Sequence, residues 1–548
     1  MPAALTGSIP TPSSLVPQSE EESVYLKPNV VIEPLVDGWY AWAHLIPPAT
    51  AARNLTERHL RIMNSYIESP ETHQAAVKNP ALLGGPFMDL GDNRVDEVSE
   101  LRERTTSQRK DLVALSRAIE QLDSLLREKG TGYSLEALYA EVPECLQGYV
   151  ELVYDLNNHP SFRLIEPLLY KSEFYDPSLQ SVMLSEIKAD DRPFVFSTPR
   201  LDRRDAVHLQ MPFASEKVDA LARMKHEPTT LAALRETLEL SSEDEQLFRS
   251  FLTTEQPKPY PKYDGDGARW RYFGHACILI ETRGVSVLLD PVLSYTYESD
   301  ISRYTYEDLP DVIDYALITH NHQDHILFET LLQLRHRIRH VVVPRSGGGA
   351  LQDPSLKLLL QQCGFESVIE LSEMEEISFD RGSITAVPFL GEHGDLNVLT
   401  KSGYLLRVNG HTLMFAADSC NISPKMYEHI HRELGDVDAL FVGMECDGAP
   451  VSWIYGPLLT QRLERAKDHS RRLAGSNFDR AMDIVNQFHC KQVYVYAMGQ
   501  EPWLTFISSI KYTEKSNPII QSTRLLETCR ERGIPAERLF GEREIFLF

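Results

Sequence analysis

The sequence predicts an α+β protein with a mainly helical N-terminal domain and a C-terminal domain in which strands and helices alternate around a mixed sheet. Three observations predict this plan. The 548 residues are more than one ordinary domain holds. Apolar residues recur at helical spacing in much of the first half, whereas short apolar runs alternate with amphipathic stretches in the second half. A proline-rich segment separates the two halves.

The N-terminal domain is expected to span residues 28–256. The segment before it, residues 1–27, is rich in Pro, Ser and Glu without any apolar period, so a disordered tail is predicted there. Alternation within residues 30–48 favours one or two short strands. From residue 51 to about 251 the pattern is mostly helical, and one helix is marked by Leu112, Leu115, Ile119, Leu122 and Leu126.

The boundary between the domains is predicted at residues 257–267. Pro257, Pro259 and Pro261 alternate with other residues and stiffen the chain, because each proline ring restricts its own φ angle. Two glycines near the end of the segment then allow the chain to turn into the next strand. A semi-rigid linker is therefore expected.

The C-terminal domain, residues 268–548, is predicted to contain ten strands and five helices. Strands are expected near 269–280, 285–290, 315–319, 340–344, 383–388, 403–408, 412–417, 439–442, 492–496 and 544–547. Helices are expected near 325–339, 354–363, 424–434, 478–488 and 522–532. Helices on both faces of a mixed sheet would bury the apolar strands.

A cluster of metal-ligand residue types lies between the predicted strand at 315–319 and the helix that follows it. The cluster reads His-x-His-x-Asp-His and consists of His320, His322, Asp324 and His325. Imidazole and carboxylate bind zinc, iron or manganese, and two His two positions apart project to the same side of an extended backbone. The alternative is a solvated polar turn in which Asp324 caps the helix. That alternative leaves three clustered His unexplained, so one turn serving two metal ions is favoured.

These residues resemble the signature of the metallo-β-lactamase superfamily, and the resemblance covers residues 268–548. It implies an αββα sandwich with the metal site at one edge. The superfamily's opening pair of strands with a tight turn is found at 277–290. Its bridging aspartate is matched by Asp418, which follows the apolar strand at 413–417.

The superfamily pattern also requires a loop ligand, usually His, and here Glu392 and His393 compete for that role. With His393 the site would be of the ordinary dizinc type. With Glu392 it would hold three carboxylates and three His, a donor set that favours iron or manganese over zinc. The usual final His is missing after the strand at 493–496. That position stays open, or Glu501 or His469 fills it.

Both departures resemble the diiron β-hydroxylases of nonribosomal peptide and chloramphenicol-type antibiotic biosynthesis. The resemblance implies six metal ligands. His320, His322 and Glu392 would hold one iron. Asp324 and His325 would hold the second iron, and Asp418 would bridge the two. It also implies a catalytic role for Glu392, since a carboxylate can change its binding mode and open a coordination position, whereas an imidazole cannot.

The function implied by this resemblance is an O₂-dependent monooxygenase that hydroxylates the β carbon of an amino acid. The amino acid would be tethered as a thioester to a peptidyl carrier domain of a nonribosomal peptide synthetase. Two Fe ions, O₂ and an external electron donor such as a reductase are implied, and the N-terminal domain would take part in a homodimer. The arginines from 192 to 204 are a candidate docking patch for the carrier. The alternative is a dizinc hydrolase of a thioester, lactone or phosphoester.

The composition argues against several other classes of protein. A net charge of −24 disfavours binding to a nucleic-acid backbone. No apolar run approaches the length needed to span a bilayer, and the N-terminus lacks the pattern of a secretory signal. The seven cysteines are dispersed without a C-x-x-C pair, as is typical of free thiols. We therefore expect a cytoplasmic enzyme that binds neither nucleic acid nor membrane.

Overall fold

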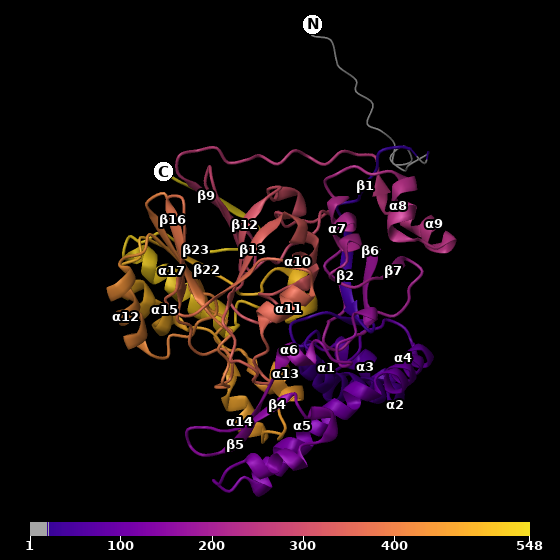
Figure 1. Ribbon diagram of the computed structural model, residues 1–548. Coiled ribbons are helices and arrows are strands. Elements are labelled where there is room, and N and C mark those ends of the chain that lie inside the picture. Colours follow the sequence, from indigo (N-terminus) through magenta and orange to yellow (C-terminus); the bar gives the residue numbers. More distant parts are fainter. Residues whose placement is uncertain (1–18, 20) are drawn as a thin grey trace.

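The computed structural model describes residue 19 and residues 21–548, and in it an N-terminal part packs beside a C-terminal part (Figure 1). Most of the predicted tail lies outside the described residues. Its last residues are folded, because β1 (Tyr25–Leu26) pairs with β8 (Leu252–Thr253) and buries Val24 and Leu26. The folded region therefore begins a few residues earlier than the sequence predicted.

The N-terminal part is mainly helical, as predicted, but it also contains a four-stranded sheet in the order β3-β2-β6-β7. Its strands are β2 (Val30–Val36), β3 (Trp39–Tyr40), β6 (Gln180–Glu186) and β7 (Ala206–Gln210). A hairpin is formed by β4 (Val150–Tyr154) and β5 (Pro160–Leu164). The helices are α1 (Pro48–Asn54), α2 (Leu60–Glu68), α3 (Pro70–Val77), α4 (Val95–Gln108), α5 (Lys110–Lys129), α6 (Glu166–Leu169), α7 (Glu216–Arg223), α8 (Leu231–Leu238) and α9 (Ser242–Ser250).

The C-terminal part is built on two seven-stranded sheets. The first sheet contains, in spatial order, β14 (Val368–Leu371), β13 (Ile338–Pro344), β12 (Ile313–Leu317), β11 (Ser286–Leu289), β10 (Cys277–Glu281), β9 (Ala268–Gly274) and β24 (Arg543–Leu547). The second contains β15 (Glu376–Phe379), β16 (Gly382–Val387), β17 (Gly403–Val408), β18 (His411–Phe415), β19 (Ala439–Gly443), β22 (Gln492–Tyr496) and β23 (Ala536–Arg538).

Helices cover the outer face of each sheet, which gives the αββα layering that the superfamily resemblance implies (Figure 1). Aromatic and branched side chains of both sheets fill the space between them, and Trp270 packs edge-on against Phe441 at a centroid distance of 5.2 Å. On the second sheet lie α12 (Pro424–Leu434), α15 (Phe478–Gln487) and α17 (Asn517–Glu531). On the first sheet lie α10 (Phe328–Leu334) and α11 (Leu356–Gln362).

Strand direction determines which edge of the sandwich carries the chemistry. β11, β12, β13 and β14 run parallel to one another, and so do β18, β19, β22 and β23. The carboxyl ends of parallel strands meet at one edge of a sheet, where loops form ligand sites. The predicted metal residues follow β12 and β18, so they are placed at the same edge.

The N-terminal part is joined to the first sheet through α10. Apolar residues of β2 and α7 form one buried cluster with Leu331 and Leu332 of α10. Beside this cluster, the Arg192 guanidinium donates to Glu33 and, at 2.6 Å, to Glu329 of α10. Arg200 also bonds Glu33. The pKa of Glu33 falls to about 2, because the two guanidinium groups outweigh the effect of its burial, which is the largest single influence and acts in the opposite direction.

This arrangement corrects the expectation that the arginines from 192 to 204 form a docking patch. Arg200 is buried and Arg192 is largely buried, because both neutralise carboxylates at the junction of the two parts. Only Arg203 and Arg204 of that set are exposed, and Arg203 already pairs with Asp205 at 2.7 Å. Two of the four arginines are thus unavailable to a partner.

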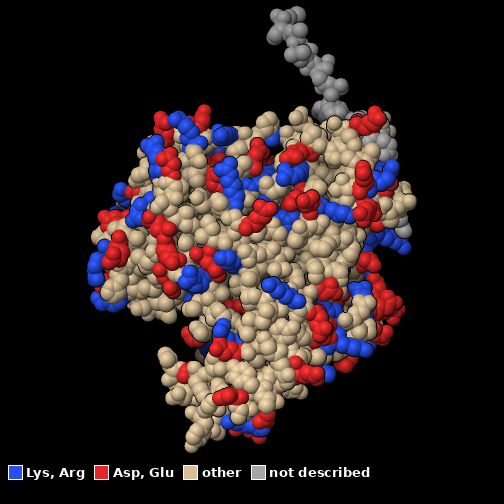
Figure 2. All heavy atoms as spheres, in the orientation of Figure 1, with Lys and Arg blue, Asp and Glu red and all other residues tan. Residues whose placement is uncertain are grey.

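The surface carries no single-sign stripe on the face shown in Figure 2, where Lys and Arg lie among Asp and Glu. Among the described residues, no helix is both long enough and apolar enough to cross a membrane. All seven cysteines are free thiols.

Candidate metal centre

The predicted ligand residues converge at the edge formed by the carboxyl ends of the parallel strands. β12 ends at Leu317 and leads directly into His320, while β18 ends at Phe415 and leads into Asp418. Glu392 enters from the loop that follows β16. Asp324 does not cap a helix, since α10 begins only at Phe328. The alternative interpretation, in which Asp324 caps the helix that follows the turn, is therefore wrong.

The first cluster joins two imidazoles and one carboxylate. His322 Nδ1 lies 2.9 Å from Glu392 Oε2, and His320 Nε2 lies 3.5 Å from the same oxygen. All three side chains are buried. Their ligand-type atoms lie within 4.8 Å of one another, which is the spacing of donors around one metal ion.

The second cluster is adjacent and shares residues with the first. His325 Nε2 lies 3.2 Å from Asp418 Oδ2, and these two group with His320. On the far side, His325 groups with Asp324 and His275. The rings of His320 and His325 are only 4.1 Å apart. The overlapping clusters form a continuous patch large enough for two neighbouring metal ions.

The backbone around this patch is unusual. Five non-glycine residues beside the clusters adopt positive φ angles: His275 (51°), Asp290 (36°), Glu392 (66°), Ala417 (48°) and Ala497 (52°). Each such conformation costs about 1–3 kcal/mol in an L-residue and persists only where the surrounding structure enforces it. Sharp turns at the strand ends thus aim side chains into the site at the expense of stability.

Several buried polar atoms in the patch have no hydrogen-bond partner among the described residues. They include His320 Nε2, Glu392 Oε2, His393 Nε2 and Asp418 Oδ1. Buried polar groups are almost always paired, so a cluster of orphaned donors and acceptors indicates a missing ion. Burial also raises the pKa of Glu392 to about 7, with His322 opposing that rise. A nearby cation would stabilise the ionised carboxylate.

Residues outside the predicted set hold the imidazoles in place. Asp290 is fully buried, and its Oδ1 accepts a hydrogen bond from Thr319 N. Its Oδ2 lies 2.8 Å from His325 Nδ1. Tyr455 OH lies 3.2 Å from His322 Nε2. Such partners orient ligating imidazoles and increase their basicity. Asp290 was detectable in the sequence, because it ends an apolar strand in the same way as Asp418; Tyr455 carries no comparable signal.

Replacing Asp290 by Asn is expected to weaken metal binding by about 10–100-fold, the usual effect of removing an outer carboxylate from a ligand His. The measurement is metal retention against a graded chelator series. Asp314→Asn is a matched control, because Asp314 accepts from Ser286 N at the opposite end of β12. Equal retention by the two variants would contradict the role of Asp290.

The structure also places the competing residues. His393 stacks on His322 with a centroid distance of 4.5 Å, but only Glu392 belongs to a ligand cluster. Glu501 accepts a hydrogen bond from Tyr272, and His469 lies on the exposed helix α14 (Arg465–Ser470). Neither of these two residues joins a ligand cluster, so the absent final His has no substitute in them.

A cavity of about 470 Å³ opens onto the clusters. Residues 81–87 of the N-terminal part form one wall, and Trp453 Nε1 secures them by donating to Gly84 O at 3.0 Å. The remaining walls include the apolar side chains of Ile454, Leu473 and Ile510. Both parts of the chain therefore shape the space above the candidate ligands His322, Asp324, Glu392 and Asp418 and above the neighbouring His275.

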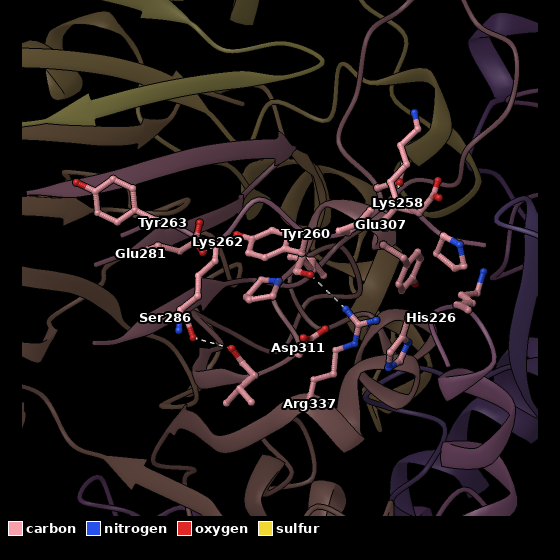
Figure 3. A pocket seen from close by; sticks show the side chains of 18 of the residues that line it. His226, Lys258, Tyr260, Lys262, Tyr263, Glu281, Ser286, Glu307, Asp311 and Arg337 are labelled. Carbon is pink, nitrogen blue, oxygen red and sulfur yellow. Dashed lines mark hydrogen bonds between the residues drawn. The ribbon is translucent and has the colours of Figure 1, made fainter. Parts of the chain in front are cut away.

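Another cavity, of about 700 Å³, lies at the opposite end of the first sheet beneath the linker. Figure 3 shows Lys258 and Tyr260 of the linker around it, together with Arg337, Asp311 and His226. Acidic and basic groups are mixed in its lining. No ligand cluster of the described residues includes a residue of this cavity. It is therefore separate from the metal centre.

Comparison with known proteins gives the same picture over almost the whole chain. Residues 25–257 match the family described as diiron non-heme β-hydroxylase N-terminal domain, and residues 286–451 match the β-lactamase superfamily domain. The chain is 40% identical to the 4-amino-L-phenylalanyl-(CmlP-peptidyl-carrier-protein) 3-hydroxylase of Streptomyces venezuelae, over 95% of this chain and 99% of the relative.

The solved structures agree. The crystal structure of CmlA, a diiron β-hydroxylase from Streptomyces venezuelae, matches with a TM-score of 0.90 and 39% identity, covering 96% of this chain and 100% of that one. The chain therefore belongs to the diiron non-heme β-hydroxylase family, and it is an enzyme with a two-iron centre that uses O₂ to hydroxylate a β carbon.

Proposed function

We propose that this enzyme hydroxylates the β carbon of an amino acid held as a thioester on a peptidyl carrier domain of a nonribosomal peptide synthetase, in antibiotic biosynthesis. The relative from Streptomyces venezuelae is named for a substrate on a peptidyl carrier protein. A tethered substrate also suits a buried metal patch below a cavity of about 470 Å³, because a flexible arm can carry the amino acid inward from the surface.

The proposed ligands are the six residues predicted from the sequence. His320, His322 and Glu392 would hold one iron, Asp324 and His325 the other, and Asp418 would lie between the two. The donor chemistry fits, since three carboxylates and three imidazoles form the mixed oxygen and nitrogen set that iron accepts. The orphaned atoms of His320, Glu392 and Asp418 fit as well, because each would gain a partner.

Iron supplies the oxygen activation and electron transfer that amino-acid side chains cannot provide. The chain supplies position and a dry cavity. Glu392 is buried and carries two oxygens that can be presented singly or together, so we assign it the catalytic role of opening a position beside one iron. Asp290 and Tyr455 keep His325 and His322 in fixed orientations, and Trp453 holds the wall at 81–87 over the site.

The remaining assignments follow from this reaction. An external reductase would supply electrons, and a homodimer would form through the N-terminal domain. We propose the predicted limits of 257–267 for the linker and 268–548 for the catalytic domain. The N-terminal domain, predicted as 28–256, is extended to include Val24 and β1, which shortens the tail predicted at 1–27. The free cysteines support a reducing compartment, the cytoplasm. Carrier docking would use a surface other than Arg192 and Arg200, which are committed to Glu33 and Glu329.

The observation that carries this proposal is the grouping of Glu392, rather than His393, with His320 and His322. The test uses protein loaded anaerobically with iron, a chemical reductant, ¹⁸O₂ and a carrier domain charged with a panel of aminoacyl groups. We expect one ¹⁸O atom on the carrier-bound amino acid, detected by mass spectrometry.

A zinc-loaded sample is the control for the hydrolase alternative. It should leave both the aminoacyl group and the thioester intact. Release of free amino acid by the zinc form, with no oxygen incorporated by the iron form, would replace the proposed function with hydrolysis.

A further inference from the structure

His275 lies beside the end of β22, the strand after which the superfamily usually has its final His. It follows β9, is only 2% exposed, and has a φ angle of 51°. Its carbonyl oxygen accepts from Ala497 N at 2.8 Å, so the β9–β10 turn is attached to the end of β22. Its ring therefore reaches the metal patch from the side that lacks a His on the last strand.

Two roles are open to this ring. A ring nitrogen of His275 groups with ligand-type atoms of Asp324 and His325, which is the arrangement of a seventh metal ligand. His275 Nε2 lies 3.3 Å from Asp324 Oδ2; the two atoms are not aligned as a hydrogen bond in the structure, but a small rotation of the ring would let Nε2 donate to the carboxylate. A ligating nitrogen must be unprotonated, whereas a donor must carry a hydrogen. The two roles therefore require opposite states of Nε2.

The other ring nitrogen decides between them. Gly499 N donates its hydrogen to His275 Nδ1 at 3.1 Å, so Nδ1 acts as the acceptor and carries no hydrogen. A neutral imidazole has one N–H, which then resides on Nε2. If Nε2 bound a metal instead, the hydrogen would move to Nδ1 and meet the Gly499 N–H head-on. The backbone after β22 thus selects the tautomer.

We propose that His275 is a positioning residue that donates its Nε2 hydrogen to Asp324 Oδ2, and that it is not a metal ligand. This inference rests on the proposed function, because it takes Asp324 as a ligand of one iron. Asp324 then presents its other oxygen to the metal, and its orientation no longer depends on the metal alone. The ring of His275 also packs edge-on against His325, 4.8 Å away, beside the same iron position.

The test compares three His275 states in the full-length protein. His275→Gln keeps an N–H₂ donor near the position of Nε2 but offers iron a poor ligand. His275→Ala removes the donor. His340→Gln is the matched control, because His340 lies on β13 away from the metals and bonds the Ser367 hydroxyl. The readouts are iron per chain, the rate of iron release to a chelator, and the number of nitrogens strongly coupled to iron in the half-reduced state by electron–nuclear double resonance.

The expected results are specific to a donor. The Gln variant should keep two irons and the same number of coupled nitrogens as the unsubstituted protein and the His340 control. The Ala variant should keep the nitrogen count but release iron about 10–100-fold faster. Loss of an iron or of a coupled nitrogen in the Gln variant would show that His275 is a ligand. Unchanged iron release in the Ala variant would remove the positioning role.

Two further measurements keep these outcomes separate. Circular dichroism shows whether the Ala variant folds; if it does not, the Gln variant alone decides between ligand and donor. Asp324→Asn tests the assumption beneath the proposal. Retention of two irons and normal hydroxylation by that variant would overturn the ligand assignment of Asp324, and the proposal with it, independently of any His275 result.

Discussion

Replacing Glu392 by Gln is expected to lower the iron content from two ions to about one per chain and to abolish β-hydroxylation. Glu392 is 7% exposed, and its Oε2 lies 2.9 Å from His322 Nδ1 and 3.5 Å from His320 Nε2. A neutral amide is a much weaker ligand than a carboxylate. Without it, the first iron position keeps two imidazoles and the shared carboxylate of Asp418.

His393→Gln is the matched control for this variant. His393 is the adjacent residue, is also buried, and would be the loop ligand of a dizinc site. We expect the control to keep two irons and most of its activity, because His393 stacks on His322 without entering a ligand cluster. Iron analysis, with the hydroxylation assay, distinguishes the two. The reverse pattern, with iron lost only from the His393 variant, would identify the imidazole as the ligand.

The metal residues were predictable because ligand chemistry leaves a local signature. His320, His322, Asp324 and His325 lie within six positions, and the direction of parallel strands brings Asp418 to the same edge. Glu392 and His393 are neighbours in sequence, so only three-dimensional grouping separates them. No such signature exists for Tyr455, which reaches His322 from a helix far along the chain.

Strand prediction succeeded where burial on one or both faces left a clear apolar pattern. β17 and β22 lie at the predicted residues, and α12 has the predicted limits. The predicted strand at 269–280 is two strands, β9 and β10, because Gly274 and His275 adopt positive φ angles and reverse the chain. The turn also accepts a hydrogen bond from Ala497 N, just after β22, a long-range contact that the local sequence does not encode.

Edge strands and the N-terminal sheet were the main omissions. β15 alternates exposed with partly buried residues, and β23 is only partly buried, so neither has a strong apolar run. β6 and β2 pair across about 150 residues, a separation at which no short-range signal specifies a partner. The arginines near 192–204 illustrate the same limit, because their burial depends on the distant carboxylates Glu33 and Glu329.

Replacing Arg192 by Met is expected to destabilise the protein by about 3–5 kcal/mol, the usual cost of leaving a buried charge without its partner. Arg192 lies between Glu33 and Glu329, whose side chains are 5% and 1% exposed. After the substitution Glu33 keeps Arg200, but Glu329 keeps only the hydroxyl groups of Tyr40 and Tyr295. The denaturant midpoint of the first unfolding transition measures the loss.

Two companions of this variant make the argument quantitative. Arg203→Met removes an exposed pair with Asp205 from the same segment and should cost no more than about 1 kcal/mol. Adding Glu329→Gln to Arg192→Met should recover part of the loss, because the unpaired charge disappears; one tyrosine hydroxyl keeps the amide oxygen as its acceptor, and the other can accept from the amide NH₂. If Arg192→Met lowered the free energy of unfolding no more than Arg203→Met does, the buried network would not hold the N-terminal part against α10.

Residues 81–87 of the N-terminal part form one wall of the metal cavity. A weakened junction should therefore also reduce hydroxylation at temperatures where the iron content is unchanged.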